Sequence, residues 1–234
     1  MSNIRIKNLF KSFDGVIALV DVNLEFASGE FVVLLGNIGS GKTTLLNIIS
    51  GLEKNYVGEI LFDETVQTEG AEERDIAIMT KEFGLFRNKT VYDNLALGLR
   101  LREVSEDEIR SRIENASEIL GFKNELDLKP KKISLLMQKQ IQLARALTRK
   151  PKIFILNEPL SGLNENDRKE LLTDILKVYE IAKCNFIYST FDSEQAKTLN
   201  KKTAVLGGGM LRQFDYLENI LKEPKDEFVK LFLG

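Results

Sequence analysis

Histidine and tryptophan are absent from this chain of 234 residues, which also contains only one cysteine and four prolines. Histidine is the side chain best suited to acid–base chemistry and metal binding near neutral pH. Its absence leaves carboxylates and phosphate ligands to carry any catalysis. One thiol cannot form an internal disulfide, which is typical of an intracellular protein. The single cysteine, Cys184, precedes an apolar segment, and we expect it to be a small buried residue.

Long apolar runs and an excess of one charge are also missing. No run approaches the ~18 residues of a membrane span, and the amino terminus lacks a charged-then-apolar leader. The 33 basic and 35 acidic residues leave a net charge of −2, so the composition offers no basic surface for nucleic acid. We therefore expect a soluble cytoplasmic protein that binds no nucleic acid. Its apolar content suffices for the core of one large or two-lobed domain.

The most informative stretch is residues 31–49, FVVLLGNIGSGKTTLLNII. An apolar run, a glycine-rich loop and an aliphatic stretch predict strand, loop and helix in that order. The loop fits G-x-x-x-x-G-K-[ST], with Gly36, Gly41, Lys42 and Thr43 at the fixed positions. Glycines let backbone N–H groups point at phosphate oxygens, and the helix start adds positive potential there. Lys42 would reach the β and γ phosphates and Thr43 would bind Mg²⁺, so the stretch predicts a nucleoside triphosphate site.

The other segments predict an alternation of strands and helices. Short apolar segments separated by turns predict strands within residues 3–35, and further strands at 57–64 and 74–80. A change to helical spacing begins near residue 90, where Thr90 and Asp93 offer a helix start. A second helix is expected from Ser105, where Glu108 would complete a capping box, and a third from the N-cap Ser134 to residue 149. The expected later elements are a buried strand ending at Asn157, a helix at 165–182, a strand in NFIYSTFD, a GGG turn at 207–209 and a closing helix.

Three residues outside the loop are candidates for the same site. Asn157 and Glu158 follow the buried strand, and ligands of open α/β sheets bind at the carboxyl ends of strands. We therefore expect both residues beside the phosphate loop. Phe13 lies in the segment KSFDG, where an aromatic ring could stack on a purine or could simply belong to the core. The residue alone leaves these two alternatives open.

Several stretches together resemble the ATP-binding subunit of an ABC transporter, of the importer class that handles sugars, polyamines and similar solutes. They are VGEILFDE, RDIAIM, TVYDNLALGLRLREV, LARAL, EPLSGL and EPKDEFVKLFLG. The resemblance implies an α/β fold in which residues 1–234 form one ABC-type nucleotide-binding domain with a RecA-like P-loop NTPase core. It also implies an antiparallel β subdomain around 1–30 and 57–66 and a helical subdomain from about 88 to 150. We expect the chain to stop before the carboxy-terminal regulatory domain of many sugar-importer subunits.

In that family two subunits face head to tail, and each ATP lies between the phosphate loop of one and the signature segment of the other. The resemblance therefore implies an adenine-stacking role for Phe13 and a water-polarising role for Glu158. Thr43 would be the metal ligand. The implied nucleotide-binding residues are Phe13, Gly36, Asn37, Gly39, Ser40, Gly41, Lys42, Thr43, Thr44 and Lys81.

The chain departs from the family pattern at five catalytic elements. Asn157 stands where the family has a magnesium-linked aspartate, and Lys81 stands where it has a glutamine that senses the γ-phosphate. Phe191 replaces a histidine. The Leu-Ser-Gly-Gly-Gln signature is replaced by Ile133, Ser134, Leu135, Leu136 and Met137, and the aspartate closing the SGL turn is replaced by Asn164.

These departures predict a site that binds ATP and hydrolyses it poorly. Asn157 and Lys81 together make the pocket two charges more positive, which disfavours Mg²⁺ and favours the bare triphosphate. The alternative for Lys81 is a lysine that faces solvent. Branched side chains at Leu135 and Leu136 obstruct the approach to a γ-phosphate. The carboxylate of Glu158 favours retained hydrolysis. The alternative is that Glu158 and the following proline serve only packing and helix geometry.

Three hypotheses follow. The first is a degenerate ABC subunit that binds ATP, pairs with a competent, non-identical nucleotide-binding subunit, and acts on transmembrane permease subunits from the cytoplasmic face of the membrane. The second is a slow ATPase that uses Lys42, Thr43 and Glu158. The third is a regulatory nucleotide-binding subunit without a transport cycle. The resemblance implies that the solute is chosen by the membrane and solute-binding partners, so this chain does not encode it.

Overall fold

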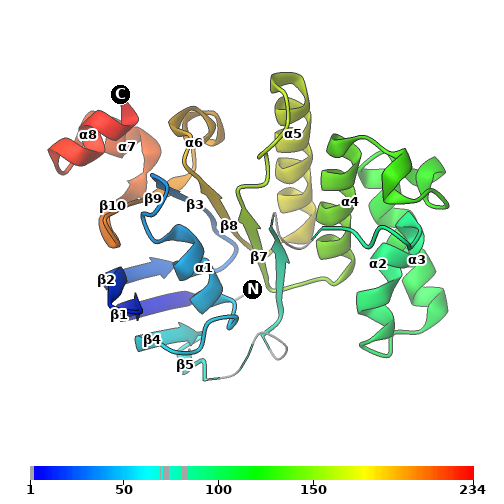
Figure 1. The fold of residues 1–234 in the computed structure, drawn as a ribbon, viewed down its shortest axis with the longest axis horizontal. Coiled ribbons are helices and arrows are strands. Elements are labelled where there is room, and N and C mark those ends of the chain that lie inside the picture. The colour runs from blue at the N-terminus through cyan, green and yellow to red at the C-terminus, as the bar shows by residue number, and fades with distance from the viewer. Residues whose placement is uncertain (1–2, 69, 71–73, 81–83) are drawn as a thin grey trace. The chain divides into compact units, whose positions relative to one another are not determined.

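The computed structural model describes residues 3–68, 70, 74–80 and 84–234. The chain divides into two compact units, each of which draws on separate stretches of sequence (Figure 1). The first unit comprises Met1–Ile78, Lys152–Glu158 and Cys184–Gly234, and the second comprises Met79–Pro151 and Pro159–Lys183.

A six-stranded sheet has the order β10-β9-β3-β8-β7-β6. Its strands are β3 (Phe31–Gly36), β6 (Ile76–Met79), β7 (Ile153–Asn157), β8 (Asn185–Thr190), β9 (Lys202–Gly207) and β10 (Met210–Tyr216). β3 runs parallel to both β8 and β9, and β7 runs parallel to β8, whereas β10 is antiparallel to β9. All residues of β3 and β8 are buried, which is typical of parallel strands covered on both faces. The predicted α/β core is confirmed.

The second sheet of the first unit is four-stranded, with the order β2-β1-β4-β5. Its strands are β1 (Ile4–Phe13), β2 (Val16–Phe26), β4 (Val57–Phe62) and β5 (Thr65–Val66). All three pairings are antiparallel, so the antiparallel β subdomain expected from the resemblance is confirmed. Asp14 and Gly15 connect β1 to β2 with φ values of 46° and 83°, as a two-residue hairpin turn requires.

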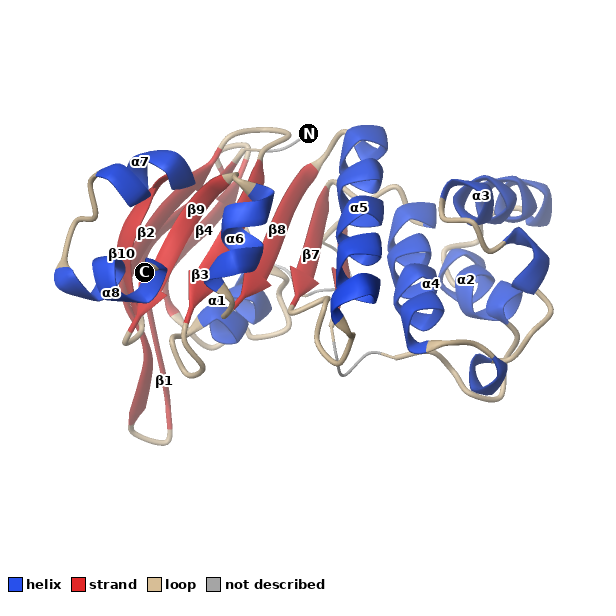
Figure 2. Cartoon of the chain, turned by 90° about the horizontal axis from the view of Figure 1, so that it is seen from above, coloured by secondary structure: helices blue, strands red, loops and turns tan. Residues whose placement is uncertain are grey.

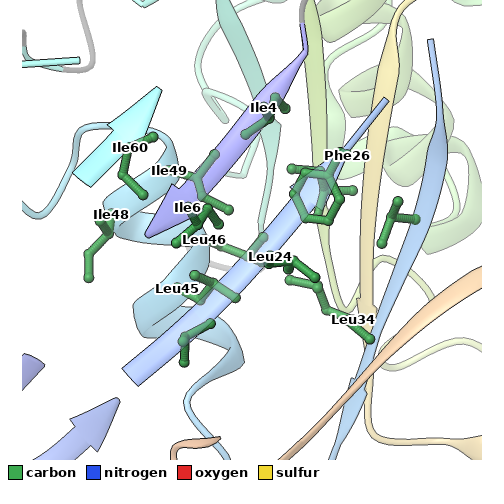
Figure 3. Close-up of a cluster of buried hydrophobic side chains, with 14 of the residues drawn as sticks. Ile4, Ile6, Leu24, Phe26, Leu34, Leu45, Leu46, Ile48, Ile49 and Ile60 are labelled. Atoms are coloured by element: carbon green, nitrogen blue, oxygen red, sulfur yellow. The ribbon is translucent and has the colours of Figure 1, made fainter. Parts of the chain in front are cut away.

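The core of the first unit forms around helix α1 (Lys42–Ile49), which follows the glycine-rich loop. Its buried side chains join one cluster with apolar residues from both sheets (Figure 3). The cluster includes Leu45, Leu46, Ile48 and Ile49 of α1 with Ile4, Ile6, Leu24, Phe26, Leu34 and Ile60. Burying an aliphatic side chain contributes roughly 1.5–3 kcal/mol. The packing of α1 therefore fixes the end of the loop from which the helix starts.

The remaining helices of the first unit are α6 (Ser193–Leu199), α7 (Leu217–Lys222) and α8 (Glu227–Leu233). The glycine turn at 207–209 joins β9 to β10, as predicted. Cys184 precedes β8 and is only 3% exposed, and burial raises the pKa of its thiol to about 12. The expectation of a small buried residue is confirmed.

The second unit is helical, and Figure 2 shows its helices in blue. It contains α2 (Val91–Arg100), α3 (Glu106–Ile119), α4 (Leu135–Thr148) and α5 (Glu165–Ala182), with short 3₁₀ turns η1 (Lys123–Glu125) and η2 (Pro130–Lys132). Besides the region from 88 to 150, this unit includes α5, which follows β7 in sequence. Among the described residues, no helix combines the length and the apolar character needed to cross a membrane.

The predicted helix starts are confirmed by their caps. Thr90 accepts a hydrogen bond from the N–H of Asp93 at 3.0 Å, and Ser134 accepts one from the N–H of Met137 at 3.1 Å. Ser105 likewise accepts from the N–H of Glu108 at 3.4 Å. The other half of the predicted capping box is replaced, because the carboxylate of Glu108 binds Arg112 and Lys150 at 2.6 and 3.3 Å. A salt-bridge partner has competed with the backbone for this side chain.

Candidate functional site

The two outer glycines of the phosphate-loop motif are required by close packing. A Cβ on Gly36 would lie 2.4 Å from the carbonyl oxygen of Leu206 and 2.6 Å from Oγ of Ser40. Gly41 has a φ of +97°, and a Cβ there would lie 2.7 Å from the carbonyl oxygen of Ala18. A side chain at either position would displace neighbouring backbone. The loop is therefore held tightly against β2 and β9.

Lys42 folds back over the loop from the first turn of α1. Its Nζ donates hydrogen bonds to the carbonyl oxygens of Gly36 at 2.6 Å and Asn37 at 3.0 Å, and to Oγ of Ser40 at 3.4 Å. The side chain is buried, and this burial lowers the pKa of the ammonium while the nearby carboxylate of Glu158 opposes the shift. The cation is thus held at the loop by neutral oxygens. Anionic phosphate oxygens would be stronger partners for it.

A pocket of about 300 Å³ opens over this loop. It is lined by Val16, Ile17, Ala18, Ile38, Gly39, Ser40, Gly41, Lys42, Thr43, Thr44 and Glu158. The expectation that Glu158 lies beside the loop is confirmed, although its role stays a prediction. Sequence reasoning missed the apolar wall formed by Val16, Ile17 and Ile38, whose exposed fractions are 71%, 58% and 86%. Apolar residues next to a hairpin turn and inside a phosphate loop were the available signal.

Asn157 and Glu158 differ in their placement. Asn157 ends β7, and its side-chain oxygen accepts a hydrogen bond from the hydroxyl of Ser189 at 2.7 Å. Asn157 is not among the described residues that line the pocket. Glu158 has a φ of 48°, and its N–H donates to the carbonyl oxygen and the hydroxyl of Ser189 at 3.1 and 3.3 Å. β8 thus holds the turn that carries the carboxylate out of the sheet.

Phe13 lies at the end of β1, directly across the hairpin turn from Val16. It is 45% exposed, so the alternative of a core aromatic is wrong. The ring is not among the described residues that line the pocket. Instead, Nζ of Lys11 lies 4.4 Å from the centre of the Phe13 ring.

Four other residues at altered family positions are either exposed or cap a helix. Lys81 lies outside the described residues. In the first unit, Phe191 follows β8 and is 49% exposed. In the second unit, Ser134 caps α4 and Leu135 is 45% exposed in its first turn. Asn164 caps α5 by accepting from the N–H of Asp167 at 3.0 Å.

Comparison with known proteins identifies the family. The ABC transporter family model matches residues 19–161. Among similar proteins, the osmoprotective compounds uptake ATP-binding protein GgtA of Synechocystis sp. is 35% identical over 100% of this chain and 65% of its own length. The trehalose/maltose import ATP-binding protein MalK of Thermococcus litoralis is 34% identical over 100% and 65%. The spermidine/putrescine import ATP-binding protein PotA of Clostridium novyi is 34% identical over 99% and 67%. The chain thus spans about two thirds of the length of these relatives.

A solved structure has the same fold. The cbiO1 protein from Clostridium perfringens, part of the ABC transporter complex cbiONQ, matches with a TM-score of 0.84 and 25% identity. The match covers 95% of this chain and 91% of cbiO1. Together with the phosphate loop and the two sheets, these matches show that the chain belongs to the ABC transporter family and has the fold of its ATPase subunits.

Proposed function

We propose that this chain is the ATP-binding subunit of an ABC importer and holds ATP at the loop between β3 and α1. The observation that carries the proposal is the placement of the Lys42 ammonium, which lies in the loop with three hydrogen bonds to its oxygens. The pocket over this loop is also lined by Thr43 and Glu158. The names of the relatives, which describe uptake or import ATP-binding proteins, support the same assignment.

The pocket and the residues next to it suit different parts of ATP. The loop N–H groups and the start of α1 favour the phosphates, and Lys42 exchanges its carbonyl partners for β and γ phosphate oxygens. Thr43 would hold Mg²⁺, which supplies charge neutralisation between the phosphates. Phe13 stacks on the adenine, and the apolar wall of Val16, Ile17 and Ile38 covers the uncharged part of the nucleotide. The phosphate-contacting set consists of Gly36, Asn37, Gly39, Ser40, Gly41, Lys42, Thr43 and Thr44, with Lys81 as a further candidate.

Hydrolysis is impaired in this proposal because the metal shell is weakened. Asn157 brings a neutral amide to the end of β7, and its oxygen is already bound to the hydroxyl of Ser189 at 2.7 Å. Mg²⁺ prefers charged oxygen ligands, so the metal binds poorly while the triphosphate is retained. The altered signature from Ile133 to Met137 and the ring of Phe191, which offers no hydrogen bond, weaken the reaction further.

A slow ATPase is the second candidate, and the position of Glu158 favours it. Glu158 lines the pocket with Lys42 and Thr43, and its backbone is held by two hydrogen bonds to Ser189. A carboxylate at this position could orient or deprotonate the attacking water. Turnover by the chain alone would then be slow but would depend on Glu158.

We further propose that the chain works with transmembrane permease subunits and with a second, non-identical ABC nucleotide-binding subunit. It would associate peripherally with the cytoplasmic face of the membrane through these partners. ATP would mainly hold the two nucleotide-binding subunits together, and hydrolysis would depend on the second subunit. Without such partners the chain would be a regulatory nucleotide-binding subunit, and isolation of its complex from cells separates the two cases.

The test combines equilibrium binding of a fluorescent ATP analogue with steady-state ATP hydrolysis in one Mg²⁺-containing buffer. We expect micromolar binding and no turnover above that of a Lys42→Ala control. Lys42→Ala should also weaken binding, because the phosphates lose their cation. Turnover that is abolished by Glu158→Gln would establish the slow ATPase instead. Failure of the unaltered chain to bind the analogue would overturn the nucleotide site itself.

A further inference from the structure

Lys11 is a buried cation that the phosphate-loop chemistry does not use. It lies on β1, and its side chain is only 6% exposed. Nζ of Lys11 lies 4.4 Å from the centre of the Phe13 ring, which is within the range of a cation–π contact. A lysine this buried requires a reason, because burial of a charge is costly unless the charge is paired.

Two partners hold the Lys11 ammonium in place. It lies 3.1 Å from the carboxylate of Glu53 and donates a hydrogen bond to the carbonyl oxygen of Asn55. A hydrogen bond from the N–H of Asn55, together with the hydrogen bond from Lys11, lowers the pKa of Glu53, so this carboxylate stays ionised. Both partners belong to the segment that follows α1. The ammonium is therefore fixed relative to the nucleotide loop, and so is the face of Phe13 that it contacts.

The register of the β1–β2 hairpin places Phe13 beside Val16, a residue that lines the pocket. Phe13 lies directly opposite Val16, and directly opposite residues of an antiparallel pair project from the same face. Val16 lines the pocket over the phosphate loop. Since Lys11 contacts one side of the ring and Phe13 is still 45% exposed, the other side is available to a ligand.

We propose that Lys11 is a positioning residue for the nucleotide base: it contacts one face of Phe13 and so presents the opposite face to a purine. The proposal rests on the proposed function, in which Phe13 stacks on the adenine. The ammonium prevents the ring from collapsing onto β1. It also draws π-electron density toward its own side, which lowers the repulsion between the free face and an electron-rich base.

The test compares ATP with inorganic tripolyphosphate, which has the phosphates but no base. Dissociation constants are measured by displacement of a fluorescent ATP analogue for the unaltered chain, Lys11→Met, Lys11→Arg and Phe13→Leu. We expect Lys11→Met to weaken ATP binding and to leave tripolyphosphate binding unchanged. The contact exists with and without ATP, so the strength of a full cation–π contact, about 30-fold, is the upper limit of the loss. Lys11→Arg should keep ATP affinity, because it keeps a cation over the ring. In a chain that already carries Phe13→Leu, Lys11→Met should cause little further loss of ATP affinity.

A matched control on the same strand is Lys7→Met, since the side chain of Lys7 is 44% exposed and its Nζ lies 3.9 Å from the carboxylate of Glu59. It removes the same charge without touching a ring, and we expect both affinities to stay unchanged. Because Lys11→Met removes the cationic partner of Glu53, the double variant Lys11→Met, Glu53→Gln is measured as well, and it should show the same selective loss of ATP affinity.

The outcomes separate this inference from the proposed function. If the unaltered chain binds both ligands and Lys11→Met binds ATP equally well, only the role of Lys11 is overturned. If both Lys11 variants bind ATP and tripolyphosphate more weakly by the same factor, the role of Lys11 is also overturned, because the effect is then structural. If the unaltered chain binds neither ligand, the proposed nucleotide site fails, and the role of Lys11 fails with it.

Discussion

The hydroxyl of Ser189 donates a 2.7 Å hydrogen bond to the side-chain oxygen of Asn157, joining the ends of two neighbouring parallel strands. The same serine accepts hydrogen bonds from the backbone N–H of Glu158. Ser189 of β8 therefore positions both the amide of Asn157 and the turn at Glu158. Asn157 stands where the family has a metal-linked carboxylate, and among the described residues Glu158 is the only carboxylate that lines the pocket.

Replacing Asn157 with aspartate should strengthen the dependence of ATP binding on Mg²⁺. The substitution restores a negative charge at the strand end, and Ser189 can still donate to the new carboxylate. We expect the gain in ATP affinity on adding Mg²⁺ to rise about tenfold, which corresponds to about 1.4 kcal/mol of metal interaction. Binding of a fluorescent ATP analogue with and without Mg²⁺ measures this gain.

The control for this charge change is Asn200→Asp, which adds the same charge after α6 and should leave the Mg²⁺ effect unchanged. The double variant Asn157→Asp, Lys81→Gln should show the largest gain, because it removes the extra positive charge as well. An equal gain from Mg²⁺ in the double variant and in the unaltered chain would contradict the weakened metal site.

Gly41→Ala should destabilise the first unit and abolish nucleotide binding. Gly41 has a φ of +97°, and the added Cβ would lie 2.7 Å from the carbonyl oxygen of Ala18. The left-handed backbone alone costs about 1–2 kcal/mol for alanine, and the close contact adds to this cost. Gly15→Ala isolates the backbone cost, since Gly15 has a φ of +83° but no atom within 4 Å of an added Cβ. Urea unfolding should show the larger loss for Gly41→Ala, and equal losses would refute the packing argument.

The stability of the chain should fall as the pH rises above 9. Burial raises the pKa of the Cys184 thiol from 9.0 to about 12. Between these values the unfolded chain releases the thiol proton and the folded chain keeps it, so deprotonation favours unfolding. The stabilisation that comes from the raised thiol pKa is fully present below pH 9 and is lost toward pH 12. Cys184→Ser should flatten this part of the curve of unfolding free energy against pH, and an unchanged slope would contradict it.

Ser134→Ala should destabilise the helical unit without changing ATP binding by the chain alone. Its hydroxyl accepts from the N–H of Met137 at 3.1 Å and caps α4. Loss of such a cap typically costs about 1 kcal/mol, and Ser134→Asp should keep the cap. Chemical unfolding and titration with the fluorescent analogue measure the two effects. Weaker ATP binding in Ser134→Ala, with Ser134→Asp as the control, would show that this serine does more than cap the helix.

Sequence reasoning succeeded where the signal is contained within a few neighbouring residues. The apolar runs on either side of Gly36, Gly41 and Lys42 predict a strand, a loop and a helix, because the loop conformation and the helix start depend on adjacent backbone. The caps Thr90 and Ser134 were predicted for the same reason, since each hydroxyl bonds an N–H three residues later. The capping box at Ser105 was only half right, because Glu108 found partners on Arg112 and Lys150.

The site outside the motif depended on contacts between distant segments. The apolar patterning and the motif by themselves determined an alternation of strands and helices with a triphosphate loop, since glycine conformations and apolar periodicity act locally. Only the tertiary structure decided that Ser189 binds Asn157, that Lys11 contacts Phe13 while paired with Glu53, and that Val16 and Ile38 form a wall of the pocket. The partners in these arrangements are brought together by β-sheet pairing and by the burial of α1 between apolar surfaces. Such packing reflects the whole unit, and no short stretch of sequence encodes it.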